Sequence, residues 1–177
     1  MLPLHTLKTM YNSLIVPHFY YCILLWGFDT TRLIKLQKKA IRVITCSKFN
    51  AHTEPLMKSL NLLKLDDIFF LQSLRFFYKY NKNQLPSYFN NMFIENAAIH
   101  SYNTRNQSAL VIPYSRTSTA RNSIRFKIPN IIRMTDESII SKMNTHSLNG
   151  FSGFTKRYLI NNYSSECSLV ECYICNR

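Results

Sequence analysis

Glycine and acidic side chains are both scarce in this chain of 177 residues, and each scarcity excludes a class of function. The three glycines (Gly27, Gly150 and Gly153) are too few and too far apart for a glycine-rich phosphate loop or a dinucleotide-binding fingerprint. Nine Asp and Glu residues are scattered along the sequence, and no pattern among them marks a two-metal catalytic centre. The composition therefore argues against a nucleotide-binding α/β enzyme, and we expect no catalytic residues, metal site, cofactor or small-molecule substrate.

Basic and aromatic residues are abundant instead. The 22 Lys and Arg residues outweigh the nine acids and leave a formal charge of +13 at pH 7. Such a balance favours polyanionic partners. Hydrophobic residues make up 46% of the chain, and the twelve Phe and eleven Tyr among them rule out a wholly disordered protein. The length leaves room for one domain, or for one domain with a trailing arm.

The five cysteines do not resemble a disulfide framework. Their number is odd, and Cys22 and Cys46 stand alone in apolar stretches, which favours a reducing, intracellular location in the nucleus or cytoplasm. The N-terminus has no small-residue cleavage site, so no signal peptide is predicted. Cys167, Cys172 and Cys175 near the C-terminus could ligate zinc, form a redox pair or belong to a frayed tail. The tail is the favoured interpretation.

One apolar segment, residues 10–28, is nearly long enough to cross a bilayer. It carries Asn12, Ser13, Pro17 and His18 in its first half, so its densest apolar run is only ten residues long. A membrane span and a buried helix interrupted at Pro17 are the two interpretations, and the buried helix is favoured.

The chain divides by amino-acid composition into three consecutive segments. Residues 1–95 are apolar and helical in pattern and form a helical domain. Residues 96–135 are basic and contain no acidic residue, with short strands expected at 110–112 and 123–128, each before a proline. Residues 136–177 hold a last helix at 149–161 and the cysteine-containing tail. The predicted fold is mainly α: a helical bundle with a small β-hairpin or irregular element in the C-terminal half.

Three further helices are predicted in the first segment. One begins at Thr30 or Thr31, which are good N-cap residues, and a second begins with Thr53 as its cap. The third begins at Asp66 or Asp67, where carboxylates favour a helix N-terminus. Its apolar residues surround almost the whole helix, which is typical of a helix at the centre of a bundle.

A basic stripe lies on the helix that begins at Thr30 or Thr31. Lys35, Lys38, Lys39 and Arg42 follow one another at i, i+3, i+4 and i+7 and so share one face. A solvated surface is one interpretation, and contact with nucleic-acid phosphates is the other. Solvated faces usually mix both signs of charge. No acidic residue occurs between Asp29 and Glu54, which makes an anionic partner more plausible.

The acid-free segment contains a second basic group. Arginine binds phosphates in a bidentate manner and aromatic rings stack on bases, so this mixture is compatible with nucleic-acid binding. An irregular surface arm held by apolar anchors is an equally good interpretation. The candidate phosphate contacts in this group are Arg105, Arg116, Arg121 and Arg125.

The order and spacing of several short strings resemble one family. With these strings the chain resembles the C-terminal part of LINE-type, jockey-like non-LTR retrotransposon reverse transcriptases, over residues 5 to about 160. The strings are 11–17 (YNSLIVP), 20–21 (YY), 25–27 (LWG), 36–42 (LQKKAIR), 51–56 (AHTEPL), 62–68 (LLKLDDI), 85–86 (LP), 100–105 (HSYNTR) and 123–126 (SIRF).

The resemblance implies a thumb and a downstream extension, in which a helical element grips the template–primer duplex by its backbone. The family's palm carries a Tyr/Phe-x-Asp-Asp motif that this chain lacks, since Asp66 and Asp67 follow Lys64 and Leu65. A Trp-Asn usual in the family is replaced at residues 131–133 by Ile-Ile-Arg. We therefore expect a truncated fragment of an RNA-directed DNA polymerase that is not an enzyme by itself, with RNA or an RNA–DNA hybrid as partner. The alternatives are a non-enzymatic protein that associates with other chains or with itself through exposed apolar surface, and the product of a relic open reading frame.

Overall fold

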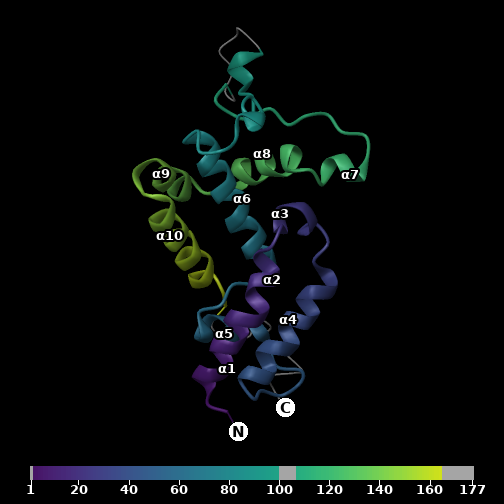
Figure 1. Ribbon diagram of the computed structural model, residues 1–177, viewed down its shortest axis with the longest axis vertical. Helices are drawn as coiled ribbons and strands as arrows, with labels where there is room; N and C mark the ends of the chain where they lie inside the picture. Colours follow the sequence, from purple (N-terminus) through teal and green to yellow (C-terminus); the bar gives the residue numbers. More distant parts are fainter. Residues whose placement is uncertain (1, 100–106, 165–177) are drawn as a thin grey trace. The chain divides into compact units, whose positions relative to one another are not determined.

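The computed structural model describes residues 2–99 and 107–164 and confirms the mainly α-helical architecture (Figure 1). Within these ranges the backbone forms α-, 3-10 and π-helices and no strand longer than a single bridge. The elements are α1 (Leu4–Met10), the π-helix η1 (Tyr11–Ile15), α2 (Val16–Tyr20), α3 (Ile23–Trp26), α4 (Thr31–Ile44), α5 (Thr53–Leu60), α6 (Leu65–Asn81), η2 (Ser87–Phe89), η3 (Asn96–Ala98), α7 (Ser118–Arg121), α8 (Ile124–Met134), α9 (Glu137–Thr145) and α10 (Leu148–Asn161).

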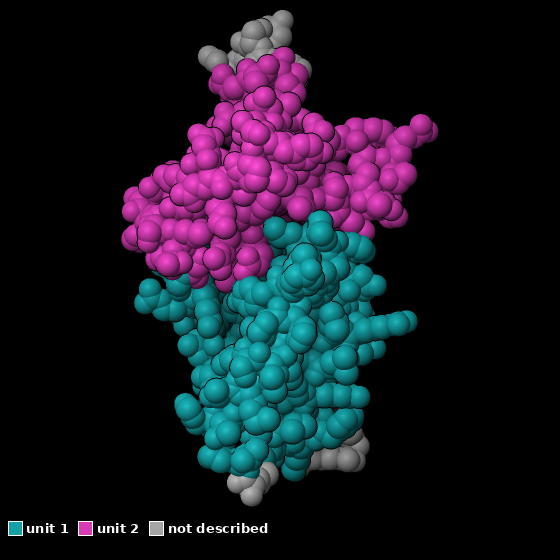
Figure 2. All heavy atoms as spheres, viewed as in Figure 1, with its two compact units in different colours: residues 1–69, 153–177 teal, residues 70–152 magenta. Residues whose placement is uncertain are grey.

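The chain forms two compact units that do not follow the three consecutive segments expected from its amino-acid composition (Figure 2). Unit 1 combines residues 1–69 with residues 153–177, and unit 2 comprises residues 70–152. Both ends of the chain therefore contribute to unit 1. The division falls inside α6 and α10, so each of these helices supplies residues to both units.

The apolar segment at residues 10–28 is helical, but Pro17 does not interrupt it as expected. The backbone stays helical from α1 through η1 to Tyr20, and the π-helical turn of η1 ends at Ile15, two residues before the proline. A π-turn widens the helix locally, which makes room for a residue that has no N–H to donate. The break comes instead at Cys22, whose φ is 49°. In the described part of the chain, no helix combines the length and the apolar character needed to cross a membrane.

Gly27, at the end of α3, allows a close approach to α6. A Cβ atom added here would lie 2.5 Å from the carbonyl oxygen of Ile23 and 2.5 Å from Cδ2 of Phe69. The indole N–H of Trp26 donates to the carbonyl of Tyr21 (2.7 Å) and closes the preceding turn. Only glycine fits at this contact.

The core of unit 1 gathers around a buried glutamine. Gln37, on α4, is 2% exposed, and its side chain makes hydrogen bonds to three other segments. Its Nε2 donates to the hydroxyl of Tyr11 (3.1 Å) and to the carbonyl of Leu63 (2.9 Å), while its Oε1 accepts the N–H of Leu65 (3.0 Å). The apolar residues buried in unit 1 are Tyr11, Phe19, Ile23, Ile41, Ile44, Met57, Leu60, Leu62, Leu63, Leu65, Ile68, Ile160 and Tyr163.

The core of unit 2 is aromatic and centres on the second half of α6. Phe93 meets Tyr80 edge-on, with the ring centroids 4.8 Å apart, and it also packs against Phe77. Phe151 of α10 is fully buried and stacks on Tyr78 at a centroid distance of 5.7 Å. Within α6 only two residues, Asp66 and Asn81, are exposed, which agrees with the prediction of a helix surrounded by other elements.

The prediction of a strand at residues 123–128 is wrong, because Ser123 is the N-cap of α8 and residues 124–128 form the first half of this helix. Ile124, Ile128 and Ile131 recur at helical spacing, and Ile128 is buried together with Pro129. Pro129 lies inside the helix rather than after its end. The side-chain amide of Asn130 donates to the carbonyl of Phe126 (2.8 Å), which supports the turn that the proline weakens. Burial of the isoleucine face outweighs the helix-breaking residue here.

Residues 94–97 and 107–111 pair in an irregular antiparallel manner. Glu95 and Leu110 form a single bridge, and the N–H groups of Asn96 and Val111 donate to the carbonyls of Ala109 (3.0 Å) and Ile94 (2.8 Å). The strand expected at 110–112 is thus reduced to this bridge. Of the two forms predicted for the C-terminal half, the structure shows the irregular element.

Candidate nucleic-acid interface

Helix α4 presents three different faces. Gln37, Ile41 and Ile44 are buried in the core of unit 1. Lys35, Lys38 and Lys39 are exposed on a second face, as the sequence pattern predicts. The third face is apolar and open, a difference from a simple two-faced helix. Its Leu36 is 57% exposed and its Val43 is 70% exposed.

The three lysines keep their charges available to an anionic partner. None of Lys35, Lys38 and Lys39 forms an ion pair with a residue in the described ranges. In unit 1 an ion pair joins Lys64 to Glu54. Like charges three and four residues apart on a helix repel one another and destabilise the helix. A bound anion would reduce this repulsion.

Arg42, the fourth member of the predicted stripe, has a different environment. Its Nε donates to the carbonyl of Ala51 (2.9 Å), and its guanidinium carbon lies 6.0 Å from the centre of the Phe49 ring. The side chain is only half-exposed. Arg42 therefore holds the loop after α4 in place, and its phosphate contact stays a prediction with less support than those of the lysines.

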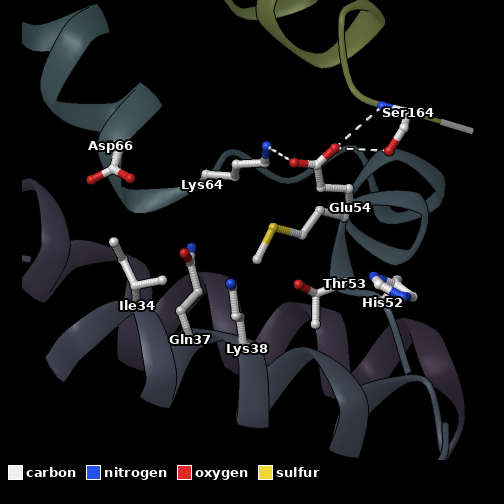
Figure 3. A pocket seen from close by; sticks show the side chains of 10 residues that line it. Ile34, Gln37, Lys38, His52, Thr53, Glu54, Lys64, Asp66 and Ser164 are labelled. Carbon is white, nitrogen blue, oxygen red and sulfur yellow. Dashed lines mark hydrogen bonds and ion pairs between the residues drawn. The ribbon is translucent and has the colours of Figure 1, made fainter. Parts of the chain in front are cut away.

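The α4–α5 pocket lies beside the lysines and was not foreseen from the sequence (Figure 3). Its volume is about 360 Å³. Lys38 projects from α4 into it, with Gln37 and Thr53 on either side, and Asp66 faces it from the start of α6 (Figure 3). The lining residues are Ile34, Gln37, Lys38, His52, Thr53, Glu54, Met57, Lys64, Asp66 and Ser164.

One side of this pocket is closed by the end of α10 and the residues after it. Glu54, in the first turn of α5, pairs with Lys64 and accepts both the N–H (3.4 Å) and the hydroxyl (2.8 Å) of Ser164. The ammonium of Lys58 donates to the carbonyls of Asn161 (3.3 Å) and Tyr163 (2.7 Å). These contacts fix the last described residues to unit 1.

Tyr163 completes this closure with a buried hydroxyl. The hydroxyl accepts the backbone N–H of Lys64 (2.9 Å) and donates to the carboxylate of Asp67. Burial raises the pKa of Tyr163 far above its usual range, and the hydrogen bond to Asp67 raises the pKa further. Burial also raises the pKa of Asp67 above 3.8, while the Tyr163 hydroxyl opposes that shift.

Glu54 and Asp67 are expected to affect stability in opposite directions as the pH changes. The hydrogen bond from Lys64 lowers the pKa of Glu54 below 4.5. The folding stability that Glu54 contributes is therefore present above pH 4.5 and is lost as pH falls through the folded-state pKa. The pKa of Asp67 is raised, so its contribution is present below pH 3.8 and is lost as pH rises through the folded-state pKa.

Denaturant unfolding of Glu54→Gln and Asp67→Asn between about pH 3 and pH 7 tests this prediction. We expect Glu54→Gln to remove part of the acid-side loss of stability. Asp67→Asn keeps an acceptor for Tyr163, and we expect its stability relative to wild type to increase as pH rises. Stability differences that change with pH in the same direction for both variants would contradict this assignment.

The second predicted group lies in unit 2 and is only partly described. Arg116, Arg121 and Arg125 are exposed, and the Nε of Arg121 donates to the carbonyl of Ser115 (3.3 Å). Arg121 ends α7, and Arg125 lies in the first turn of α8. Arg105 lies outside the described residues. Arg116, Arg121 and Arg125 remain candidates for phosphate contact: Arg121 lies on α7, Arg125 on α8 instead of the expected strand, and Arg116 precedes α7.

The residues that the structure describes form no metal-binding site. In those ranges no group of three or more His, Cys, Asp or Glu side chains is placed to hold a metal ion. Cys167, Cys172 and Cys175, the possible zinc or redox residues, lie outside the described part of the chain. Cys22 and Cys46 are exposed free thiols.

No protein-family model matches this chain, and searches of curated proteins and of solved structures find no significant match.

Proposed function

We propose that this chain is a fragment of a retrotransposon reverse transcriptase without its catalytic palm, and that its own activity is sequence-independent binding to the backbone of RNA or an RNA–DNA hybrid. The observation that carries the binding proposal is the exposed lysine face of α4, without a carboxylate partner in the described structure. The fragment origin is supported by the ordered strings in the sequence alone. No polymerase activity is proposed.

The spacing of the lysines suits a phosphate backbone. An α-helix rises about 1.5 Å per residue, so Lys35 and Lys39 are roughly 6 Å apart along the axis of α4. Lys38 lies between them along that axis on the same face. Ammonium groups on flexible stems act as point charges and can follow neighbouring phosphates of one strand. Such contacts position a duplex without reading its sequence.

Replacing Lys35, Lys38 and Lys39 together with alanine tests the proposal. Arg42 is left unchanged because its bond to Ala51 supports the neighbouring loop. If about six phosphates are contacted in all, log affinity for a labelled RNA–DNA hybrid should fall with log salt at a slope near −5. The triple-lysine variant should lower the magnitude of that slope to roughly 2.5. Fluorescence anisotropy at several salt concentrations measures both slopes.

A matched control removes three positive charges elsewhere. Lys82, Arg133 and Arg157 are exposed and lie outside α4, so alanine at these positions makes the same change in net charge. We expect the control variant to keep most of the wild-type slope. Binding that does not depend on salt, or equal slopes for the two variants, would reject the lysine face as the contact.

A second candidate function is association with a protein, and the open apolar face of α4 favours it. Leu36 and Val43 lie one helical repeat of seven residues apart and are both more than half exposed. Contiguous exposed apolar surface commonly marks an interface. Light scattering on the same samples separates the two functions, since an oligomer that persists at all salt concentrations without affinity for the hybrid supports association.

A further inference from the structure

The α4–α5 pocket places a carboxylate that backbone binding does not use opposite one of the lysines of α4. Lys38 and Asp66 both face the open space, and they come from different elements (Figure 3). Apolar surface from Ile34 and Met57 also lines it. A ligand that fills the pocket can therefore place a negative group at one end, a hydrogen-bond donor at the other and an apolar body between them.

Four other polar side chains of the pocket, those of Gln37, Glu54, Lys64 and Ser164, are occupied. Gln37 uses both hydrogens of its amide on Tyr11 and Leu63. Lys64 and Ser164 are both bound to Glu54. Those groups shape the wall of the pocket and fix its position in unit 1.

Lys38 and Asp66 differ from these occupied groups. Lys38 has no ion-pair partner in the described ranges. Asp66 accepts the Thr30 hydroxyl through Oδ1 (2.8 Å), which leaves Oδ2 for a ligand. The side chain of Asp66 is exposed.

We propose that this pocket holds one unstacked nucleotide of an RNA strand bound along α4, with its phosphate on Lys38 and an amino group of its base on Asp66. This inference depends on the proposed nucleic-acid binding. The volume of about 360 Å³ lies within the range of pockets that enclose small organic groups. Extruded bases are read by hydrogen bonds to their edges while their faces lie against apolar side chains.

The charge of Asp66 determines which bases fit. A carboxylate accepts from the exocyclic amino group of cytosine, which is an established recognition pair. Uracil presents a carbonyl oxygen at the same position, and that oxygen faces the carboxylate without a proton between them. The pocket should therefore favour cytosine over uracil, although backbone contacts along α4 have no such preference.

Two labelled RNA decamers, oligo(C) and oligo(U), test the inference by fluorescence anisotropy with the full chain. We expect wild type to bind oligo(C) about tenfold more tightly, the discrimination that one good base contact supplies. Asp66→Asn keeps an acceptor for Thr30 and adds a donor for uracil, so the preference should disappear. Glu137→Gln removes a carboxylate from the first turn of α9, outside the pocket, and should keep the preference.

A measurement on wild type alone covers the case in which Asp66→Asn fails to fold. A decamer of N4,N4-dimethylcytidine has no amino hydrogens to donate, and we expect it to bind no better than oligo(U). Equal, salt-dependent binding of oligo(C) and oligo(U) overturns the pocket inference and leaves the proposed function intact. Absence of binding to the decamers and to the RNA–DNA hybrid by folded protein overturns both.

Discussion

Replacing Gln37 with alanine is expected to lower the free energy of unfolding by about 3 kcal/mol, because it leaves three buried polar groups without a hydrogen-bond partner. The amide is the partner of the Tyr11 hydroxyl, the Leu63 carbonyl and the Leu65 N–H. Each group left buried without a partner costs about 1–3 kcal/mol, and some of them will recover contacts with water in the space that is left. Denaturant unfolding monitored by far-UV circular dichroism gives the difference.

Gln72→Ala is the matched control for this prediction. Gln72 also lies inside a helix, α6, but it is half-exposed rather than buried. Because alanine is the best helix former, the control should change stability by less than about 0.5 kcal/mol. A loss below about 1 kcal/mol for Gln37→Ala would show that its three hydrogen bonds do not hold unit 1 together.

Replacing Phe151 with alanine is expected to destabilise unit 2 by about 4 kcal/mol, the largest loss that we predict for a single side chain. Phe151 is 0% exposed and stacks on Tyr78, whose hydroxyl donates to the carbonyl of His146 (2.9 Å). Truncation removes buried apolar surface and an aromatic pair, and it leaves a cavity where the ring filled the space between α6 and α10. Near-UV circular dichroism during denaturation follows the aromatic core directly.

Phe154→Ala serves as the control on the same helix. Phe154 is half-exposed, so its replacement should cost roughly half as much or less. Phe154 belongs to unit 1 and Phe151 to unit 2. Similar losses for the two would mean that the stack on Tyr78 adds nothing to what burial along α10 contributes.

The central and terminal helices could be predicted because their signals are local. Helix α6 begins beside Asp66 and Asp67 and carries apolar residues on all sides, and both features are visible in a short stretch of sequence. Helix α10 was expected at 149–161 and begins at Leu148. Helix α9 was not expected, because it has only three apolar residues, Ile139, Ile140 and Met143, and the rest of it is polar.

Helix α4 shows where local patterns are insufficient. Its sequence offers two apolar sets, and Leu36 belongs to the set that lies open while the polar Gln37 is buried. The partners of Gln37 lie 26 to 28 residues away in the sequence, so its burial depends on the tertiary structure alone. The predicted N-cap at Thr30 likewise depends on the tertiary structure. Its hydroxyl donates to Asp66 and does not accept a hydrogen bond from the first turn of its own helix.

The candidate site was predicted in part. The exposed face of Lys35, Lys38 and Lys39 follows from helical spacing, which needs no knowledge of the fold. The α4–α5 pocket assembles residues from four stretches of the chain, including Ser164 from the far end. No periodicity links those stretches, so the pocket required the structure.

The closure of unit 1 by Tyr163 and Ser164 also sets an order of events during protein synthesis. These residues bind Glu54, Lys64 and Asp67, which leave the ribosome about a hundred residues earlier. At translation rates of roughly 5–20 residues per second, the first helices wait about 5–20 s for their last partners. All of unit 2 is made during that interval. A nascent chain of this protein therefore exposes, for seconds, the side of unit 1 that Tyr163 and Ser164 later cover.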